Sequence, residues 1–155
     1  MIREMRTTDF DNIIDIMKMN ATEAGTGIGA IDEKELYEML RHLFIKPGYK
    51  IFVNDNEKIT GFIVCQAIKN PWNGRKEGNI IFHYVIPAYR NGFTAKNLLA
   101  QAESWFRSLD CEYFMADVRA WQADYSTNQE FIEQGHNFFN KMMNHCGYCY
   151  VKEIL

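Results

Sequence analysis

The chain has 155 residues, with 17 basic and 20 acidic side chains and a formal net charge of −3. Its apolar fraction of 47% excludes a disordered chain, and the lack of a long basic run argues against broad nucleic-acid binding. The longest apolar stretch, Ile80–Pro87, falls well short of the ~18 residues of a membrane span, so we expect no membrane association. A length in this range predicts a single domain, residues 1–155.

The first half of the chain predicts a strand, two helices and a hairpin. Alternating apolar and polar residues indicate strands, and apolar residues at helical spacing indicate helices. Thr8 and Asp9 offer N-caps to the first helix, and Asn54–Glu57 has the composition of a turn, so the strands around it are expected to pair antiparallel. In chain order these elements are the strand Ile2–Arg6, the helix Phe10–Asn20, a helix that Asp32 caps and Pro47-Gly48 ends, and the strands Lys50–Val53 and Ile59–Ala67.

The second half predicts a buried strand, a helix and another buried strand, and then helical and strand segments. The first three should form a parallel pair joined by a right-handed crossover. Together with the hairpin they give an α/β (α+β) fold with a mixed sheet and helices on both faces. The final strand, if it lies at an edge of the sheet, is where two copies of the chain would pair as a homodimer. The elements are the strand Asn79–Val85, the helix Thr94–Leu109, the strand Tyr113–Val118, one or two helical segments within Asn128–Asn144 interrupted near Gly135, and the strand Tyr148–Ile154.

The junction between the strand Asn79–Val85 and the helix Thr94–Leu109 has the composition of an anion site. The first turn of a helix presents free backbone N–H groups and the positive end of the helix dipole. Arg90 adds a positive charge, Gly92 allows a ligand to approach the backbone closely, and Thr94 adds a hydroxyl donor. These features suit a pyrophosphate; the alternative is an ordinary strand–helix turn with an exposed arginine.

This junction resembles the signature of the GNAT (Gcn5-related N-acetyltransferase) superfamily, whose members share this order of elements. The family's V-x-P-x-x-R turn is matched by Val85–Arg90, and Arg90 and Ala95 fit the first and last positions of its Arg/Gln-x-x-Gly-x-Gly/Ala loop. The middle glycine of that loop is replaced by Phe93, and the nearest glycine, Gly92, comes one residue early. Phage-encoded GNAT-like sequences often carry such a loosened loop, and this chain is similar to them.

The resemblance implies a GNAT-like, mostly antiparallel sheet of six to seven strands whose central parallel pair splays apart. It also implies that the chain binds acetyl-CoA or another acyl-CoA, with the pyrophosphate at the start of the central helix and the pantetheine arm between the splayed strands. An amine, on a small molecule or a protein, would attack the thioester carbonyl directly. The residues expected to bind the donor are Val85, Arg90, Asn91, Gly92, Phe93, Thr94, Ala95 and Lys96.

The reaction needs a base for the ammonium proton, and His83 is the first candidate because imidazole titrates near working pH. Strand alternation places His83 on the face shared by Ile81 and Val85. The alternative is a satisfied histidine of the core or of an interface. The carboxylates of Glu77 and Glu23 are further candidates for the base, although such groups are more often solvated charges.

The acid that protonates the leaving thiolate is commonly a tyrosine in the family, in a Phe-Tyr-x-x-x-Gly-Phe/Tyr pattern near the C-terminus. Gly147-Tyr148 fits the last two positions, but Met142-Met143 or Phe138-Phe139 stands at the first two and supplies no phenol. Tyr148, or Tyr150 beyond it, is the candidate that remains for the acid. Water is the alternative proton source, because a thiolate is only modestly basic.

Two other motifs are not expected to carry function. Gly25-x-Gly27-x-x-Ala30 matches a dinucleotide fingerprint but follows a predicted helix instead of a strand. Cys146 and Cys149 have the spacing of a redox pair, yet they follow a helix, whose dipole there raises a thiol pKa. No second cysteine pair stands at metal-ligand spacing, so we expect no metal. Nothing in the cysteine usage demands an oxidising compartment, which favours the cytoplasm.

Two functions are compatible with these observations. The first is an acyl-CoA-dependent N-acyltransferase, most simply an acetyltransferase, whose acceptor pocket would be lined by Ala21–Ile31, Asn70–Gly74 and Trp121–Tyr125. The second is a GNAT-shaped protein that has lost catalysis and serves as a structural or binding component, for example in the assembly of a phage virion. The retained Arg90 favours the first function, and Phe93 at the glycine position favours the second.

Overall fold

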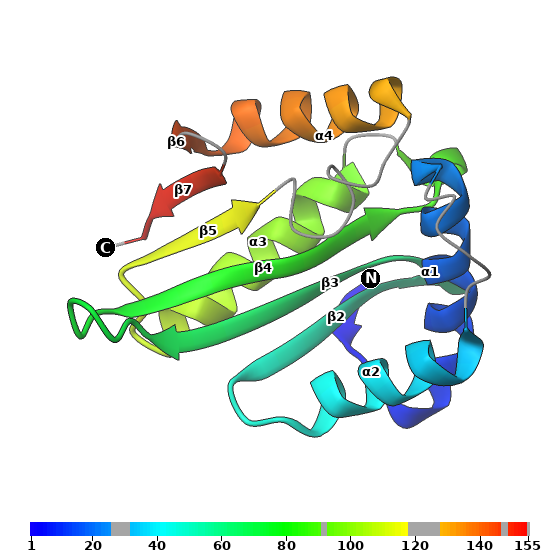
Figure 1. Ribbon diagram of the computed structural model, residues 1–155, viewed down its shortest axis with the longest axis horizontal. Coiled ribbons are helices and arrows are strands. Elements are labelled where there is room, and N and C mark those ends of the chain that lie inside the picture. Colours follow the sequence, from blue (N-terminus) through cyan, green and yellow to red (C-terminus); the bar gives the residue numbers. More distant parts are fainter. Residues whose placement is uncertain (26–31, 91–92, 118–127, 147–148, 155) are drawn as a thin grey trace.

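The computed structural model describes residues 1–25, 32–90, 93–117, 128–146 and 149–154. In this part of the chain one sheet of seven strands has the order β1-β2-β3-β4-β5-β7-β6 (Figure 1). The β4–β5 pair is parallel, and the other neighbouring pairs are antiparallel. The predicted mixed, mostly antiparallel sheet is therefore confirmed. The strands are β1 (Ile2–Glu4), β2 (Tyr49–Asn56), β3 (Lys58–Lys69), β4 (Lys76–Val85), β5 (Tyr113–Asp117), β6 (Asn144–Cys146) and β7 (Cys149–Glu153).

Helices cover both faces of the sheet, as predicted. The helices are α1 (Phe10–Ala24), α2 (Glu33–Ile45), α3 (Phe93–Ser108) and α4 (Gln129–Met142), with the 3-10 turns η1 (Thr7–Asp9) and η2 (Pro87–Tyr89). Buried residues of α1 and α2 pack with Ile51 and Phe62 on one face, and those of α3 pack with Ile63 and Ile80 on the other. None of the described helices combines the length and the hydrophobicity that a membrane-spanning helix needs.

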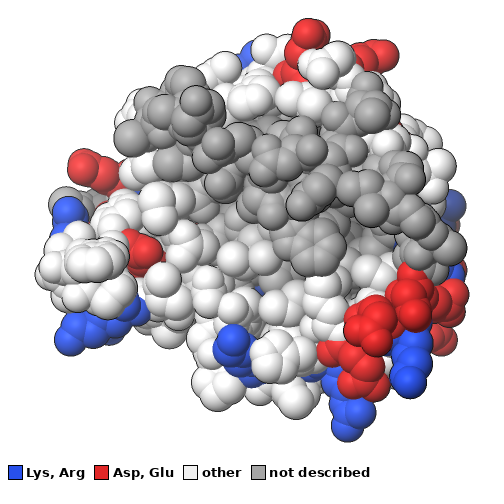
Figure 2. All heavy atoms as spheres, in the orientation of Figure 1, with Lys and Arg blue, Asp and Glu red and all other residues white. Residues whose placement is uncertain are grey.

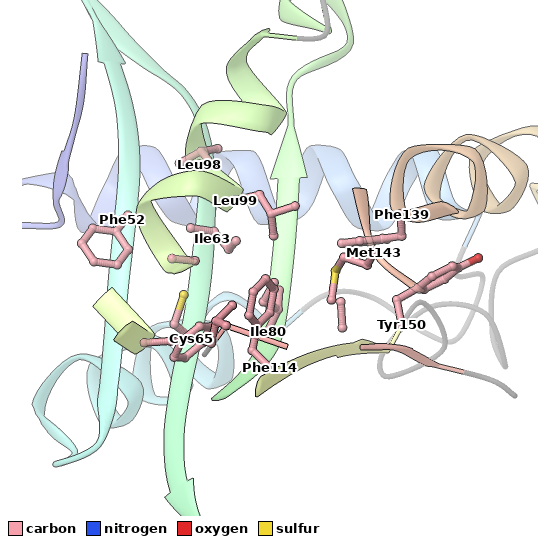
Figure 3. Packing of buried hydrophobic residues seen from close by; sticks show 14 of the residues in the cluster. Phe52, Ile63, Cys65, Ile80, Leu98, Leu99, Phe114, Phe139, Met143 and Tyr150 are labelled. Carbon is pink, nitrogen blue, oxygen red and sulfur yellow. The ribbon is translucent and has the colours of Figure 1, made fainter. Parts of the chain in front are cut away.

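The larger core lies between the sheet, α3 and α4. Figure 3 shows Leu98 and Leu99 of α3 near Ile80 of β4, with Phe139 of α4 and Tyr150 of β7 beside them. Burying a large apolar side chain contributes about 1.5–3 kcal/mol to folding. This core therefore ties α3 and α4 firmly to β4, the strand at the centre of the candidate site.

The central parallel pair splays apart, as the resemblance implies. β4 and β5 pair from Glu77–Tyr113 to Ile80–Ala116, whereas β4 itself continues to Val85. Within the described residues, β4 beyond Ile80 has a strand partner on one side only, which is β3. Among the described residues, the sheet is consequently open beside the second half of β4.

A β-bulge in β4 corrects the predicted orientation of its side chains. Val64 pairs with Phe82 and Cys65 pairs with Ile80, so Ile81 is an extra residue in β4. A bulge of this kind interrupts the alternation of side chains along a strand. Strict alternation predicted that Ile81 shares a face with His83 and Val85. Ile81 instead packs with the α1–α2 core on the other face.

The helix near the C-terminus is continuous, and the predicted interruption near Gly135 is wrong. α4 runs from Gln129 to Met142 through Gly135, although glycine inside a helix costs about 1 kcal/mol relative to alanine. Asn128 caps its first turn by accepting a hydrogen bond from the Phe131 N–H at 3.2 Å. This cap and the burial of Phe139 offset the cost of the glycine.

The first helix also differs from its prediction at both ends. It extends past its predicted end to Ala24, where Gly25 adopts a left-handed conformation with φ of 67°. At its start Asp9 makes no capping hydrogen bond. Its carboxylate instead accepts hydrogen bonds from the Arg3 guanidinium at 2.7 and 3.0 Å and from the Arg6 N–H at 2.7 Å.

The last strand does not form an edge of the sheet. β7 lies between β5 and the short strand β6, which the sequence patterns did not predict. Cys146 of β6 pairs with Cys149 of β7 at the turn of this hairpin. The expectation that the final strand is an edge strand is therefore wrong, because β6 pairs with Cys149–Val151 of β7, and a homodimer stays a prediction.

The close approach of α3 to β4 generates a prediction about Gly78. A Cβ atom at Gly78 would lie 2.6 Å from ring atoms of Phe106, a fully buried residue of α3. We expect Gly78→Ala to lower the free energy of unfolding, measured in urea, by about 1–3 kcal/mol. Phe106→Leu should relieve this clash, so the double variant should be less destabilised than the sum of the two single changes. Additive effects would contradict the contact.

Candidate functional site

The open side of β4 presents backbone groups that face away from β3. The Ile86 N–H donates to the Thr60 carbonyl at 2.9 Å, which makes that pair a hydrogen-bonded pair of the antiparallel ladder. Hydrogen-bonded and non-hydrogen-bonded pairs alternate along such a ladder, so the backbone groups of His83 and Val85 point away from β3. The Val85 carbonyl accepts a hydrogen bond from Arg90 Nε at 2.8 Å. The backbone of His83 faces the opening between β4 and β5.

The ring of His83 lies against α4 and the start of α3. It stacks on Phe138, with ring centroids 5.4 Å apart, and meets the edge of Phe139 at 6.0 Å. Its Nε2 atom is buried and has no hydrogen-bond partner among the described residues. Burial lowers the pKa of His83 to about 4, although a hydrogen bond with the Ala95 backbone acts in the opposite direction. His83 is therefore a neutral imidazole at neutral pH.

The guanidinium of Arg90 is bonded to residues of α1, β4 and α4. Its Nη1 and Nη2 atoms donate to the two carboxylate oxygens of Glu23 at 2.5 and 2.6 Å. Nη1 also donates to Gln134 Oε1 at 3.2 Å. The guanidinium lies over the rings of Tyr84 and Phe131, at 5.2 and 5.7 Å from their centroids. These contacts join α1, the end of β4 and α4, and we call this group the Arg90 clamp.

Glu23 is poorly suited to act as a base. Burial raises the pKa of its carboxyl, but the hydrogen bonds from Arg90 and Tyr84 and the arginine charge outweigh burial, so the pKa lies below its usual value. Tyr84 donates its hydroxyl proton to Glu23 Oε2 at 2.8 Å. Both carboxylate oxygens thus already accept hydrogen bonds from the protein.

The described residues expected to hold the donor's phosphates lie in the first turn of α3. Phe93, the first residue of the helix, is 70% exposed, so its ring is not part of the core. Thr94 is buried and Lys96 is exposed. The first turn carries no acidic residue, which suits an anion. Asn91 and Gly92 lie outside the described residues.

Glu77 lies far from the other candidates. It begins the paired half of β4, six residues before His83, which is about 20 Å along a strand. It is buried and accepts hydrogen bonds from Asn70, at 2.8 Å, and from the Tyr113 hydroxyl. The structure does not bring this carboxylate to the opening beside β4.

The β3–β4 turn, expected in the acceptor pocket, occupies the same distant end of the sheet as Glu77. Figure 1 shows this turn at the left and the end of α1 at the right. Trp72 in the turn is 94% exposed, and Figure 2 shows both basic and acidic side chains at the left of the molecule. Asn70–Gly74 therefore cannot line one pocket with Ala21–Gly25, and Trp121–Tyr125 lies outside the described residues.

Tyr150 of β7, a candidate for the acid, forms a hydrogen bond with His136 of α4. The Tyr150 hydroxyl lies 2.8 Å from His136 Nδ1, and its ring stacks on Phe139. Burial raises the pKa of Tyr150. Tyr150 of β7 pairs with Ala116 of β5. The Ile80–Ala116 pair is also the last described pair between β4 and β5. No sequence signal indicated His136, because α4 and β7 meet only in the folded chain. Tyr148 lies outside the described residues.

The described cysteines indicate neither a metal nor a redox site. Cys65 and Cys111 are free and buried, and burial raises the pKa of both thiols. Within the part of the chain that the structure describes, no group of three or more His, Cys, Asp or Glu side chains could hold a metal ion.

Comparison with known proteins gives both a family and a fold. The model of the acetyltransferase (GNAT) family matches residues 13–138. None of the curated proteins matches the chain. Among solved structures, a tetramutant of the BH1408 protein from Bacillus halodurans is 16% identical with a TM-score of 0.77, over 100% of this chain and 97% of that one.

Two named acetyltransferases show the same fold. A ribosomal-protein-alanine N-acetyltransferase from Brucella melitensis biovar Abortus 2308 is 12% identical with a TM-score of 0.70, over 100% of this chain and 97% of that one. An aminoglycoside antibiotic 6′-N-acetyltransferase from Acinetobacter haemolyticus is 13% identical with a TM-score of 0.69, over 100% and 94%. Identities this low show the fold alone, and they confirm the predicted GNAT-like architecture.

The Arg90 clamp should make a measurable contribution to stability. In a double-mutant cycle of Glu23→Gln and Arg90→Met, we expect a coupling energy of about 0.5–3 kcal/mol at pH 7. Because the pKa of Glu23 is lowered from 4.5, this stabilisation is present above that pH and is lost as the pH falls through the lowered value. Urea unfolding at several pH values measures it.

A matched control for the clamp is the pair Arg75 and Glu112. Arg75 also forms a salt bridge with a carboxylate, at 2.7 Å, and also lies over a tyrosine ring. The side chains of Arg75 and Glu112 are, however, more exposed than those of Arg90 and Glu23. Its coupling energy should stay below about 1 kcal/mol. A clamp coupling no larger than that of the control would contradict the packing described here.

The low pKa of His83 predicts a loss of stability in mild acid. Since the folded state holds His83 neutral down to about pH 4, whereas an ordinary histidine titrates near 6.5, protonation between these values favours the unfolded state. Relative to wild type, His83→Phe should therefore lose less stability from pH 7 to pH 4.5, measured by urea unfolding. His42→Phe, at an exposed position, is the control and should behave like wild type. Equal losses in all three proteins would contradict a buried neutral His83.

Proposed function

The chain belongs to the acetyltransferase (GNAT) family, and from this premise we propose that it transfers an acetyl group from acetyl-CoA to an amine. The amine nitrogen attacks the thioester carbonyl, the new C–N bond forms and the C–S bond breaks. The amine loses a proton and the thiolate gains one. Both named neighbours act on amines, one on an aminoglycoside and one on a protein; we propose the same acceptor class, a small-molecule or protein amine.

The observation that carries this proposal is the parting of β4 and β5 beyond the Ile80–Ala116 pair. An extended chain of amides can add to a strand whose backbone groups lack a neighbour. The pantetheine arm of acetyl-CoA is such a chain, and the backbone of His83 faces the opening. The arm would therefore lie along β4, with the thioester close to the bulge at Ile81.

The start of α3 suits the diphosphate of the donor. Its first turn combines backbone N–H groups with the positive end of the helix dipole, and Lys96 adds an exposed cation. Phe93 keeps its backbone N–H, and its exposed ring leaves the core side of the turn unobstructed. The residues present thus fit the donor, although Phe93 narrows the approach that a glycine would leave open.

We assign proton transfer to two groups near the opening. The Nε2 atom of neutral His83 is buried in this structure, so it can accept a hydrogen bond from an uncharged attacking amine only once that atom is uncovered. Its low pKa makes it a weak base, so it orients the amine and leaves most of the proton transfer to water. On the other side of Phe139, the Tyr150 hydroxyl and His136 form a hydrogen-bonded pair that can supply a proton to the thiolate.

The proposal is tested by titrating the protein with acetyl-CoA in a calorimeter. We expect saturable binding that Lys96→Glu weakens about tenfold or more, because a charge-assisted contact to phosphate is lost. Lys69→Glu makes the same charge change on an exposed lysine at the far end of β3 and should leave the affinity unchanged. No binding at about 1 mM acetyl-CoA, the upper end of ordinary KM values, would contradict the proposal and favour a structural or binding role such as a component of a phage particle.

A further inference from the structure

Arg90 is the residue whose place in the structure departs most from the role that the signature implies. In the signature it stands at the start of the phosphate loop, yet its guanidinium is held by Glu23 of α1. We propose that Arg90 is a positioning residue, which locks the donor-binding end of α3 to α1 and α4, and that it does not contact the donor's phosphates. This inference rests on the proposed function for the identity of the donor.

The first step of the argument is that Arg90 fixes the turn between β4 and α3. Its Nε atom donates to the Val85 carbonyl at 2.8 Å, and its backbone N–H donates to the Pro87 carbonyl at 3.1 Å. These two hydrogen bonds fix the turn between Val85, the last residue of β4, and Arg90. Since α3 starts at Phe93, three residues beyond Arg90, the place of Arg90 limits where the helix can begin.

The second step is that the clamp joins this turn to two other helices. Glu23 lies in the last turn of α1, and its backbone carbonyl accepts a hydrogen bond from Asn128 Nδ2 at 2.8 Å. Asn128 in turn caps α4, and Gln134 of α4 accepts a hydrogen bond from Arg90. The ends of α1, β4 and α4 therefore meet at one ionic contact, next to the start of α3.

The third step concerns the charge that remains for a phosphate. The carboxylate of Glu23 neutralises the guanidinium, and its lowered pKa keeps it ionised at neutral pH. The Nε, Nη1 and Nη2 atoms of Arg90 all donate to protein acceptors, and Tyr84 and Phe131 lie against the guanidinium. A phosphate bound to Arg90 would have to break this arrangement, whereas Lys96 is exposed in the first turn of α3.

The test compares two donors that differ in their phosphates. Acetyl-CoA and S-acetylpantetheine, which has the thioester arm without phosphates, are titrated into the full chain and followed by ¹H–¹⁵N NMR. If Arg90 positions α3, Arg90→Lys and Glu23→Gln should weaken both probes by a similar factor, about 10- to 100-fold. The double variant Glu23→Gln/Arg90→Lys should bind no more weakly than the weaker single variant.

A phosphate-binding role predicts a different pattern. Lysine binds phosphate well, so Arg90→Lys would keep most of the affinity for acetyl-CoA, and Glu23→Gln would release the arginine and raise that affinity. Arg90→Gln would weaken acetyl-CoA and leave S-acetylpantetheine unchanged. Any of these results overturns the inference. Arg75→Lys, which alters a similar arginine–glutamate pair at the opposite end of β4, is the control and should change neither affinity.

A measurement without any donor separates this inference from the proposed function. Amide hydrogen exchange of Lys96–Leu99 in α3 and of Ile132 in α4 should be about tenfold faster in Arg90→Lys than in wild type. A tenfold change corresponds to the loss of about 1.4 kcal/mol of coupling between Arg90 and Glu23. Arg75→Lys should leave it unchanged. If wild type binds neither probe, the proposed function fails, and faster exchange in Arg90→Lys still supports positioning. Unchanged exchange overturns it.

Discussion

Backbone hydrogen bonding along β4 changes halfway along the strand, and the candidate site depends on that change. From Glu77 to Ile80 the strand is paired on both sides. Beyond the bulge at Ile81, β3 is the only strand of the described residues that pairs with it. Backbone groups near the core that lack partners are costly, so the open edge needs other partners. Arg90 donates a hydrogen bond to the Val85 carbonyl. The backbone of His83 faces the space that we assign to the donor.

Two positive charges near this opening differ in their surroundings. Arg90 is partly buried, bonded to Glu23 and covered by aromatic rings, so its charge acts locally and holds elements together. Lys96 is exposed at the positive end of α3, where its charge adds to the helix dipole. Arg90 and Lys96 therefore have different roles, although they belong to one short segment of the chain. Arg90 is neutralised within the clamp, whereas Lys96 is solvated at the start of α3.

Aromatic packing connects the two sides of the opening through α4. His83 of β4 contacts Phe138 and Phe139, and Phe139 stacks on Tyr150 of β7. The same packing that stabilises α4 removes water from His83 and so lowers its pKa. The chain's large aromatic content, 14%, thus has a consequence for the chemistry of the opening as well as for the core.

The sequence by itself determined the order of the elements except for the short strand β6, because periodicity, caps and turns are local properties of the chain. The strand–helix junction with Arg90 and the candidate His83 were also visible there. Only the tertiary structure decided that β4 has a bulge at Ile81, that Glu77 lies at the far end of the sheet and that Arg90 binds Glu23. These features depend on strand register and on contacts between residues distant in the chain, such as Glu23 and Arg90, and a sequence pattern records neither.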